Sequence, residues 1–366
     1  MGELFCGPGG MALGAHLAAV GLPEVTLVHS WANDLDSDTC STYRVNIPGA
    51  TTDSVICQDV RTLELGQLSA IDGLAFGFPC NDFSTVGKSL GLGGRFGPLY
   101  TFGVSALRQH NPLWFVAENV SGLQSSNEGK AFEQILRELE SAGEWGYSLY
   151  PHKYRFDLYG VPQRRSRIII VGIRKDLNVK FAIPSPEIYK SFDVSVQRAL
   201  ENPPIDKDAP NHEATRHAAH VVERLSHIGP GENAFSADLP EHLKLHVRGA
   251  TISQIYRRLR AGHPAYTVTG SGGGGTHVYH WEENRALTNR ERARLQTFPD
   301  TFEFLGAKGS VRRQIGMAVP VSGAQAVFTA LFNSFLGVDY PSVEPNLKDL
   351  STLDVRQAEA KIMGTA

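Results

Sequence analysis

Short apolar runs alternate with helical patterns through the first half of the chain. Five runs rich in β-branched and aromatic residues predict strands, at residues 3–6, 25–34, 71–79, 113–120 and 166–174. Apolar residues at the spacing of an α-helix follow the first and the fourth run, at residues 11–22 and 130–143. Because strands alternate with helices, the pattern predicts an α/β fold with a doubly wound, mostly parallel sheet.

The pattern changes after residue 176. Residues 177–262 are rich in Pro, His and mixed charge with little periodicity, and SGGGG at 271–275 is typical of a loop. Helical spacing returns in ALTNRERARLQTF, which has a Thr/Asn start, and in SGAQAVFTALFNSFLG. We therefore expect a larger domain from residues 1–176 plus 306–345, a smaller irregular domain over 177–305, and a polar, peripheral tail at 346–366.

Composition places the chain among ordinary globular proteins. It has 366 residues, 42% of them hydrophobic and 20% charged, which is enough for two domains. No run of about 18 apolar residues indicates a membrane span, and the first residues lack the basic and apolar regions of a signal peptide. Four cysteines without a Cys-x-x-Cys spacing indicate a reducing, cytoplasmic compartment and no structural metal site. We expect Cys6, Cys40 and Cys57 to be core residues or supports for neighbouring side chains.

Charge is unevenly distributed along the chain. The net charge is −3, yet residues 244–313 carry twelve Lys and Arg against five Asp and Glu. This segment therefore has an excess of seven positive charges on an otherwise acidic chain. A basic segment of this kind is typical of a polyanion-binding face, although a solvated basic surface without a partner gives the same pattern.

Residues suited to a nucleoside ligand lie at three strand ends, those of the runs 3–6 and 25–34 and that of a further strand at CQDV. The glycines of FCGPGG, at 5–10, let the backbone approach a ligand at the start of a helix. Asp34 ends the second run, where an acid can accept hydrogen bonds from ribose hydroxyls, and Asp59 in CQDV could accept from an adenine amino group. The turn is not Gly-x-Gly-x-x-Gly, so the three features together predict an adenosine ligand and not a dinucleotide.

Cys80, in the stretch GFPCNDFS, is either a small buried residue or a nucleophile. It follows a predicted strand, at the sheet edge where doubly wound folds bind ligands. A glycine-rich polar loop, 83–100, comes next and could close as a lid. A buried structural cysteine has little need of such a loop, which favours the nucleophile. Glu118 ends the next strand, where it could act as a general acid.

A third group of polar residues lies in GVPQRRSRIIIVG. Gln163, Arg165 and Arg167 alternate at strand spacing, so Arg165 and Arg167 should point to the same side. Two guanidinium groups on one side are suited to holding a base edge or a phosphate.

Six segments in this order resemble the DNA cytosine-5 methyltransferase family of bacterial type. They are FCGPGG, GFPCNDFS, ENV, QRRSR, RALTNRERARLQTFPD and RQIGMAVPV. The resemblance extends from residue 4 to about residue 338. It implies a Rossmann-like class I methyltransferase fold with a smaller target-recognition domain over 177–305.

The resemblance also implies a reaction. The thiolate of Cys80 would add to C6 of a flipped-out cytosine, and C5 would take a methyl group from S-adenosylmethionine. Glu118 would bond N3 and the amino group, and Arg167 would hold O2.

Further site residues follow from the family's motifs. The cofactor would contact Phe5, Gly7, Gly9, Gly10, Asp34, Leu35, Asp59, Val60 and Leu99. The DNA would contact Ser84, Arg95, Gln163, Arg165 and Thr267, with Thr267 acting through its backbone.

Two positions depart from the family pattern. Asn81 follows the cysteine where the family has Gln, and Met317 stands where the family has Asn before a small residue and Val. A change at either position could alter the cofactor pocket or reduce activity.

Three other functions are compatible with parts of the pattern. The same chemistry on tRNA or another RNA is one, and the long variable insert argues for duplex DNA instead. A catalytically weak DNA-binding regulator conflicts with the intact Cys80, Glu118 and Arg167, and a Rossmann dehydrogenase conflicts with the glycine spacing. We expect a monomeric cytoplasmic enzyme at the bacterial nucleoid, acting on double-stranded DNA, with a cognate restriction endonuclease as a candidate functional partner and no metal.

Overall fold

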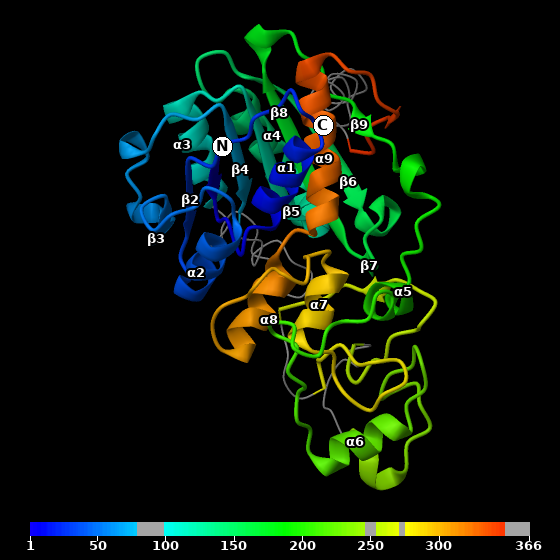
Figure 1. Cartoon of the computed structure of the whole chain (residues 1–366). Helices are drawn as coiled ribbons and strands as arrows, with labels where there is room; N and C mark the ends of the chain where they lie inside the picture. The colour runs from blue at the N-terminus through cyan, green and yellow to red at the C-terminus, as the bar shows by residue number, and fades with distance from the viewer. Residues whose placement is uncertain (79–98, 246–253, 271–274, 348–366) are drawn as a thin grey trace.

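A seven-stranded sheet forms the centre of the larger domain in the computed structural model, which describes residues 1–78, 99–245, 254–270 and 275–347 (Figure 1). The strand order is β3-β2-β1-β4-β5-β8-β6. The first five of these strands run parallel, and β8 is antiparallel to both neighbours. This confirms the doubly wound, mostly parallel sheet. The strands are β1 (Gly2–Leu4), β2 (Trp31–Asp34), β3 (Val55–Cys57), β4 (Gly73–Gly77), β5 (Trp114–Val120), β6 (Tyr147–Arg155) and β8 (Ser166–Arg174).

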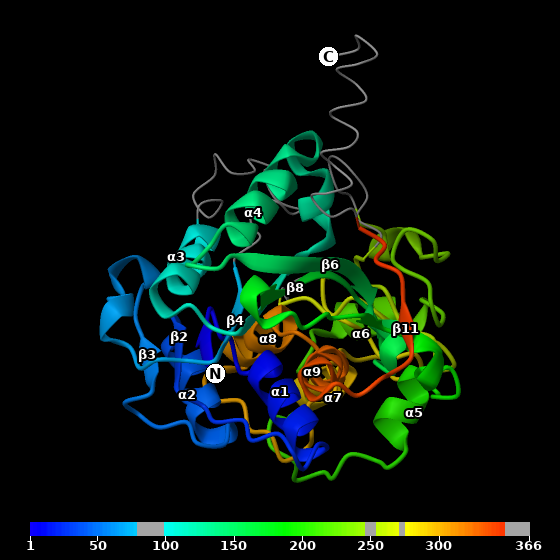
Figure 2. The ribbon, with the colours of Figure 1, turned by 90° about the horizontal axis from the view of Figure 1, so that it is seen from above.

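Helices cover both faces of this sheet. Figure 2 shows α3 and α4 on one face and α1 and α9 on the other. Consecutive side chains of β4 pack on opposite faces of the sheet: Leu74 and Phe76 belong to one buried apolar cluster, and Ala75 belongs to the other. The helices of the larger domain are α1 (Gly10–Val20), α2 (Ser37–Asn46), α3 (Tyr100–His110), α4 (Lys130–Glu140), α8 (Lys308–Met317) and α9 (Val321–Leu336).

The packing of α1 against α9 depends on a glycine. A Cβ atom added at Gly14 would lie 2.5 Å from the Cβ of Ala324 and 2.8 Å from the carbonyl oxygen of Val321. The absence of a side chain there lets the first helix pack against the last one.

Residues Lys308–Leu336 are apolar and long enough to span a membrane by composition, but 78% of the most apolar window is buried in the protein. Packing in the core accounts for that apolarity.

In the central sheet, β2 and β6 differ most clearly from the sequence expectation. The run 25–34 forms a strand only at Trp31–Asp34, because its partner β1 begins at Gly2, opposite Trp31. Strand β6 was not predicted because Pro151 interrupts YSLYPHKYR. It lies at the sheet edge, where one side needs no ladder hydrogen bonds and proline is tolerated.

The expected smaller domain, residues 177–305, contains an apolar cluster of its own. Its buried members run from Leu225 to Ala286. Other buried residues of this range, such as Val196, Leu259 and Phe298, belong to the main apolar cluster that the larger domain shares. The remaining helices are α5 (Val196–Glu201), α6 (Ala219–Ser226) and α7 (Asn289–Leu295). The remaining strands form two short pairs: β7 (Gln163–Arg164) with β10 (Ala265–Tyr266), and β9 (Ile183–Pro184) with β11 (Ser342–Val343).

Two smaller expectations also need correction. Cys6 and Cys40 are buried as expected, but Cys57 is exposed because it ends the edge strand β3. The beginning of the tail is not peripheral. Asn346 exchanges two hydrogen bonds with the backbone of Lys153 on β6, and Leu347 is buried.

The contact between α1 and α9 yields a stability prediction. Gly14→Ala should lower the free energy of unfolding by about 1–3 kcal/mol, because overpacking outweighs the higher helix propensity of alanine. Gly21→Ala is the matched control, since a Cβ there would meet nothing closer than 3.5 Å. Urea unfolding followed by circular dichroism measures both, and equal stability of the two variants would contradict the close approach.

Candidate active site

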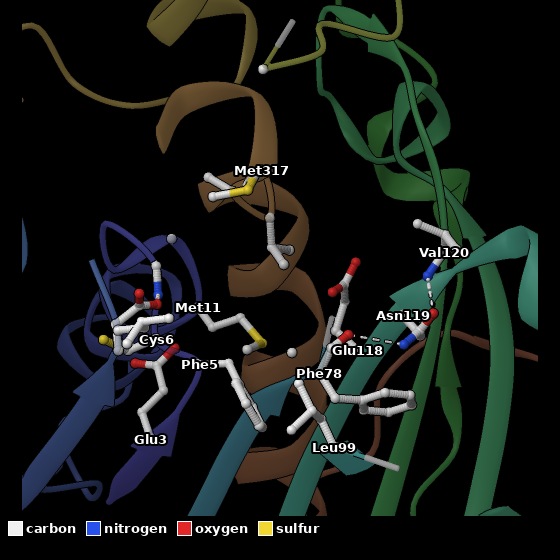
Figure 3. Close-up of a pocket in the computed structure, with 18 of the residues that line it drawn as sticks. Glu3, Phe5, Cys6, Met11, Phe78, Leu99, Glu118, Asn119, Val120 and Met317 are labelled. Carbon is white, nitrogen blue, oxygen red and sulfur yellow. Dashed lines mark hydrogen bonds between the residues drawn. The ribbon is translucent and has the colours of Figure 1, made fainter. Parts of the chain in front are cut away.

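A cavity of about 560 Å³ lies where the carboxyl ends of β1, β2, β4 and β5 meet. Figure 3 shows Glu3 and Cys6 on one side of it and Glu118 and Asn119 on the other. Doubly wound sheets bind ligands at this edge of their strands. The cavity is therefore the place where the predicted ligand site should form.

Most of the predicted site residues line this cavity. They are Phe5, Gly7, Gly10, Asp34, Leu35, Asp59, Val60, Leu99, Glu118, Arg165, Arg167 and Thr267. Gly9 and Gln163 are not among the lining residues. Cys80, Ser84, Arg95 and Asn81 lie outside the described residues, but Phe78, two residues before Cys80, is part of the cavity wall.

The turn after β1 is shaped around Asp34. Phe5 and Gly7 both have positive φ, 53° and 55°, so the chain reverses sharply there. The N–H of Gly7 donates to Oδ2 of Asp34 at 2.9 Å, and the N–H of Asp36 donates to Oδ1 at 3.0 Å. Each carboxylate oxygen keeps a further lone pair for a ligand hydroxyl. Burial raises the pKa of Asp34, against the lowering effect of these backbone donors.

Gly9 belongs to the turn and not to the cavity wall. Its φ is 100°, and a Cβ there would meet the side chain of Ile47. This glycine therefore allows the chain to enter α1, which makes it a structural member of the glycine turn.

Asp59 is engaged by a neighbour. Its carboxylate forms an ion pair with Arg61 at 2.6 Å, and it also accepts from the backbone N–H of Arg61. Both side chains are partly exposed, so a ligand amino group would compete with a screened, weak ion pair.

Glu118 and Arg167 form the charged pair of the site. Arg167 Nε lies 2.7 Å from Glu118 Oε1, and both side chains are largely buried. They come from neighbouring antiparallel strands, where Arg167 stands opposite Val120, two residues beyond Glu118. Burial raises the pKa of Glu118, and the charges of Arg167 and Arg165 oppose that effect. A carboxyl group so placed is suited to holding a proton that it can share with a ligand.

Asn119 positions the strand that leads toward Cys80. Its buried side-chain amide donates to the carbonyl oxygen of Phe78 at 3.0 Å, and its side-chain oxygen accepts from the N–H of Val120 (Figure 3). The bond ties the end of β5 to the end of β4. In the stretch ENV, Glu118 thus faces the cavity, and Asn119 holds the ends of β4 and β5 together at the cavity wall.

Glu3 is a cavity residue that sequence reasoning missed. It is 1% exposed, and its Oε2 accepts from the hydroxyl of Tyr43 at 2.9 Å. Its other oxygen, Oε1, is buried without a hydrogen-bond partner, and burial raises the pKa of Glu3 to about 8. An acid within the first predicted strand, two residues before the motif FCGPGG, was the available signal. An unpaired buried carboxylate oxygen at a cavity wall fits a cationic ligand group.

Gln163 and Arg165 hold the two domains together, a role that their alternating spacing did not predict; their contact with DNA stays a prediction. Both are buried, with exposures of 0% and 1%. Gln163 donates to the carbonyl of Leu295 and to the side chain of Gln296, and accepts from the N–H of Val268. These hydrogen bonds place Gln163 at the domain junction, whereas the next residue, Arg164, is exposed.

Arg165 completes the same junction from the other side. Its two terminal nitrogens donate to the carbonyl oxygens of Val268 at 3.1 Å and of Gly316 at 3.0 Å. The side chain of Gln296 donates in turn to the carbonyl of Ile315 at 2.7 Å. We call Gln163, Arg165 and Gln296 the polar junction. It joins β7, the segment after β10, α7 and the end of α8.

Thr267 and Met317 lie beside the polar junction and line the cavity. The hydroxyl of Thr267 donates to the carbonyl of Arg164 at 2.7 Å, so this threonine ties the smaller domain to β7. Met317, at the end of α8, is 64% exposed, which leaves its thioether free to contact a ligand. Among the described residues, no group of three or more His, Cys, Asp or Glu could hold a metal ion.

The raised pKa of Glu3 predicts a pH-dependent stability. The folded state binds this proton up to about pH 8, whereas the unfolded chain releases it near pH 4.5. The bound proton therefore stabilises the folded state fully below about pH 4.5, and this stabilisation is lost as the pH rises through about 8. Without cofactor, Glu3→Gln should equal wild type at pH 4.5 and exceed it by up to about 4 kcal/mol at pH 9. Thermal unfolding across this range gives the comparison, and parallel curves would contradict the burial.

The polar junction predicts unequal effects for two neighbouring arginines. Arg165→Met should lower the free energy of unfolding by about 2–4 kcal/mol, because two buried carbonyls lose their donors. Arg164→Ala, one residue away and exposed, should change it by less than about 0.5 kcal/mol. Denaturant titration of both variants measures this. If Arg165→Met were as stable as wild type but no longer bound DNA, a direct DNA contact would be correct instead.

Comparisons with known proteins identify the chain. The family model for C-5 cytosine-specific DNA methylases matches residues 1–333. The chain is 56% identical to the type II methyltransferase M.BbvI of Brevibacillus brevis, with 93% of each chain covered. It is 39% identical to M.NgoFVII of Neisseria gonorrhoeae, over 88% of this chain and 83% of the relative.

Solved structures share the fold at lower identity. The Dnmt2 methyltransferase of Schizosaccharomyces pombe (S. pombe) aligns with a TM-score of 0.61 at 17% identity, covering 92% of this chain and 98% of its own. The sheet order, the cavity at its carboxyl edge and the sequence matches agree. The chain therefore belongs to the C-5 cytosine-specific DNA methylase family and is a DNA (cytosine-5-)-methyltransferase of the restriction–modification type.

Proposed function

We propose that this enzyme transfers a methyl group from S-adenosylmethionine to C5 of a flipped-out cytosine in a specific double-stranded DNA sequence, through a covalent Cys80 adduct at C6. The observation that carries the proposal is the pair Glu118 and Arg167. It lies in the wall of the same cavity that holds the predicted cofactor residues. Glu118, which can hold a proton, and the cationic Arg167 thus face the place where the methyl donor would bind.

The cavity fits S-adenosylmethionine in three respects. Glu3 offers a buried, unpaired carboxylate oxygen to a cationic group, and Asp34 keeps lone pairs for ribose hydroxyls. Phe5, Val60 and Leu99 give apolar surface for the adenine ring. When bound there, the cofactor supplies an electrophilic methyl group. The partly exposed Asp59 could accept from the adenine amino group in competition with Arg61.

The target base would be activated by three side chains of this enzyme. The thiolate of Cys80 adds to C6, and the electron pair of the C5–C6 bond moves toward C5. The raised pKa of Glu118 lets its carboxyl group share a proton with N3, which neutralises the developing charge. Arg167, held against Glu118 at 2.7 Å, would hold O2. C5 then takes the methyl group, a base such as water removes the C5 proton, and Cys80 leaves.

The base must leave the helix for this reaction, because C5 and C6 are inaccessible within a stacked duplex. Ser84 and Arg95, in loop 83–100, would close over the flipped nucleotide. The basic segment 244–313 and the Thr267 region would face the DNA. We further propose a monomer that acts at the bacterial nucleoid in the cytoplasm, alongside a cognate restriction endonuclease with which it forms no stable complex.

Methylation of plasmid DNA tests this proposal. Wild type with labelled S-adenosylmethionine should modify cytosines in one short sequence, which bisulfite sequencing then identifies. Cys80→Ser should give no product, and Glu118→Gln should lower kcat by about 100-fold or more, because it cannot transfer the proton.

Two outcomes would contradict the proposal. Wild type that labels tRNA and not DNA would move the activity to RNA. Unchanged methylation by Cys80→Ser would exclude the covalent mechanism while leaving the family assignment in place.

A further inference from the structure

A second, smaller cavity of about 180 Å³ lies beside the ribbon formed by β7 and β10. Arg164 and Tyr266 of this ribbon line the small cavity, whereas the next residues along each segment, Arg165 and Thr267, line the active-site cavity. Successive side chains of extended chain point to opposite sides. The ribbon therefore separates the two cavities, and Figure 1 shows β7 at the junction between the sheet and the smaller domain.

Of the described residues, four arginines and a histidine line the small cavity, and no carboxylate does. One of them, Arg258, has a structural role. It is buried, and its guanidinium donates to four backbone carbonyls of the smaller domain and to the side chain of Asn284. We call the remaining basic residues, Arg164, Arg257, Arg260 and His263, the arginine pocket.

In the part of the chain that the structure describes, the guanidinium groups of the arginine pocket have no acidic partner. Within the described residues, neither Arg164 nor Arg260 forms an ion pair or a side-chain hydrogen bond, and Arg257 lies over the ring of Tyr266 at 4.9 Å. The nearby acid Glu232 is engaged with the N–H of Gly229 at 2.8 Å.

Two other arginines in this part of the chain are paired with acids. Arg285 bonds Glu283 and Glu291, and Arg294 bonds Asp300. Like charges gathered in a hollow repel each other and raise the local positive potential. The arrangement is therefore suited to a bound anion.

We infer that the arginine pocket binds a backbone phosphate of the substrate DNA close to the target base. Guanidinium groups bind phosphate oxygens with two parallel hydrogen bonds, which suits them to this ligand. The pocket adjoins the active-site cavity through one ribbon, so the same duplex can reach both. The inference rests on the proposed action on double-stranded DNA.

The phosphate would bridge the two domains. Arg164 belongs to β7 and the sheet side of the junction, whereas Arg257 and Arg260 belong to the smaller domain. Phosphate contacts fix the position of a protein on DNA without reading its sequence. The pocket therefore contributes to affinity and register, and the choice of bases lies elsewhere.

DNA binding as a function of salt tests this inference. Arg260→Ala and Arg164→Ala should each weaken binding on the order of tenfold, by the same factor for duplexes with and without the methylated sequence. The slope of log K against log salt should become shallower by about one, because each variant loses one phosphate contact. Fluorescence anisotropy with labelled duplexes measures both quantities, and Arg260→Lys should retain the slope with weaker binding.

The control is Arg108→Ala, an exposed arginine on α3 far from the junction, which should match wild type.

Salt slopes equal to wild type in both Arg260→Ala and Arg164→Ala, with DNA methylation by wild type intact, would overturn the inference and leave the proposed function in place. A changed methylated sequence would also overturn it, since it would mean base reading. Binding of inorganic pyrophosphate lost in Arg260→Ala, without an effect on DNA, would assign the pocket to a free phosphate compound. Wild type that binds no DNA would overturn both proposals.

Discussion

The polar junction of Gln163, Arg165 and Gln296 is the constraint on which the arrangement of the molecule depends. Three segments far apart in sequence supply carbonyls or N–H groups to it, and each polar group is buried. Buried donors and acceptors that lose their partners are costly, so the network permits few alternative domain positions. It sets Thr267 and Met317 at the edge of the cavity whose floor the sheet provides. The cavity is therefore shaped by a contact between domains as well as by the sheet.

Burial of acids gives the cavity its chemical character. Glu3, Asp34 and Glu118 all line it, and burial raises the pKa of each. Each acid has a different partner: a tyrosine hydroxyl, two backbone N–H groups, or an arginine. The end with Glu3 and Asp34 suits a cationic nucleoside, and the end with Glu118 and Arg167 suits a base that must gain a proton. One cavity thus provides two electrostatically different sites.

The sequence predicted the sheet, several of its helices and twelve of the residues that line the cavity, because strand ends, glycine turns and family motifs are local signals. It did not reveal the partners that long-range packing brings together. The regular spacing of Gln163 and Arg165 indicated a DNA contact and did not reveal the domain junction that both side chains hold. Glu3 and the arginine pocket were missed for the same reason: their significance depends on burial and on missing partners. Pro151 concealed an edge strand, since proline argues against a strand unless the edge position is known.

Covalent trapping tests the central claim, that Cys80 attacks a flipped cytosine at the cavity edge lined by Glu118 and Arg167. A duplex carrying 5-fluorocytosine at the target position has no C5 proton to lose after methyl transfer, so the Cys80 adduct should persist. With S-adenosylmethionine, mass spectrometry should find the protein joined to the methylated duplex, with the link at Cys80. The same mixture with Cys80→Ser should give no adduct. Methylation without any trapped protein, or a link at another residue, would contradict the account.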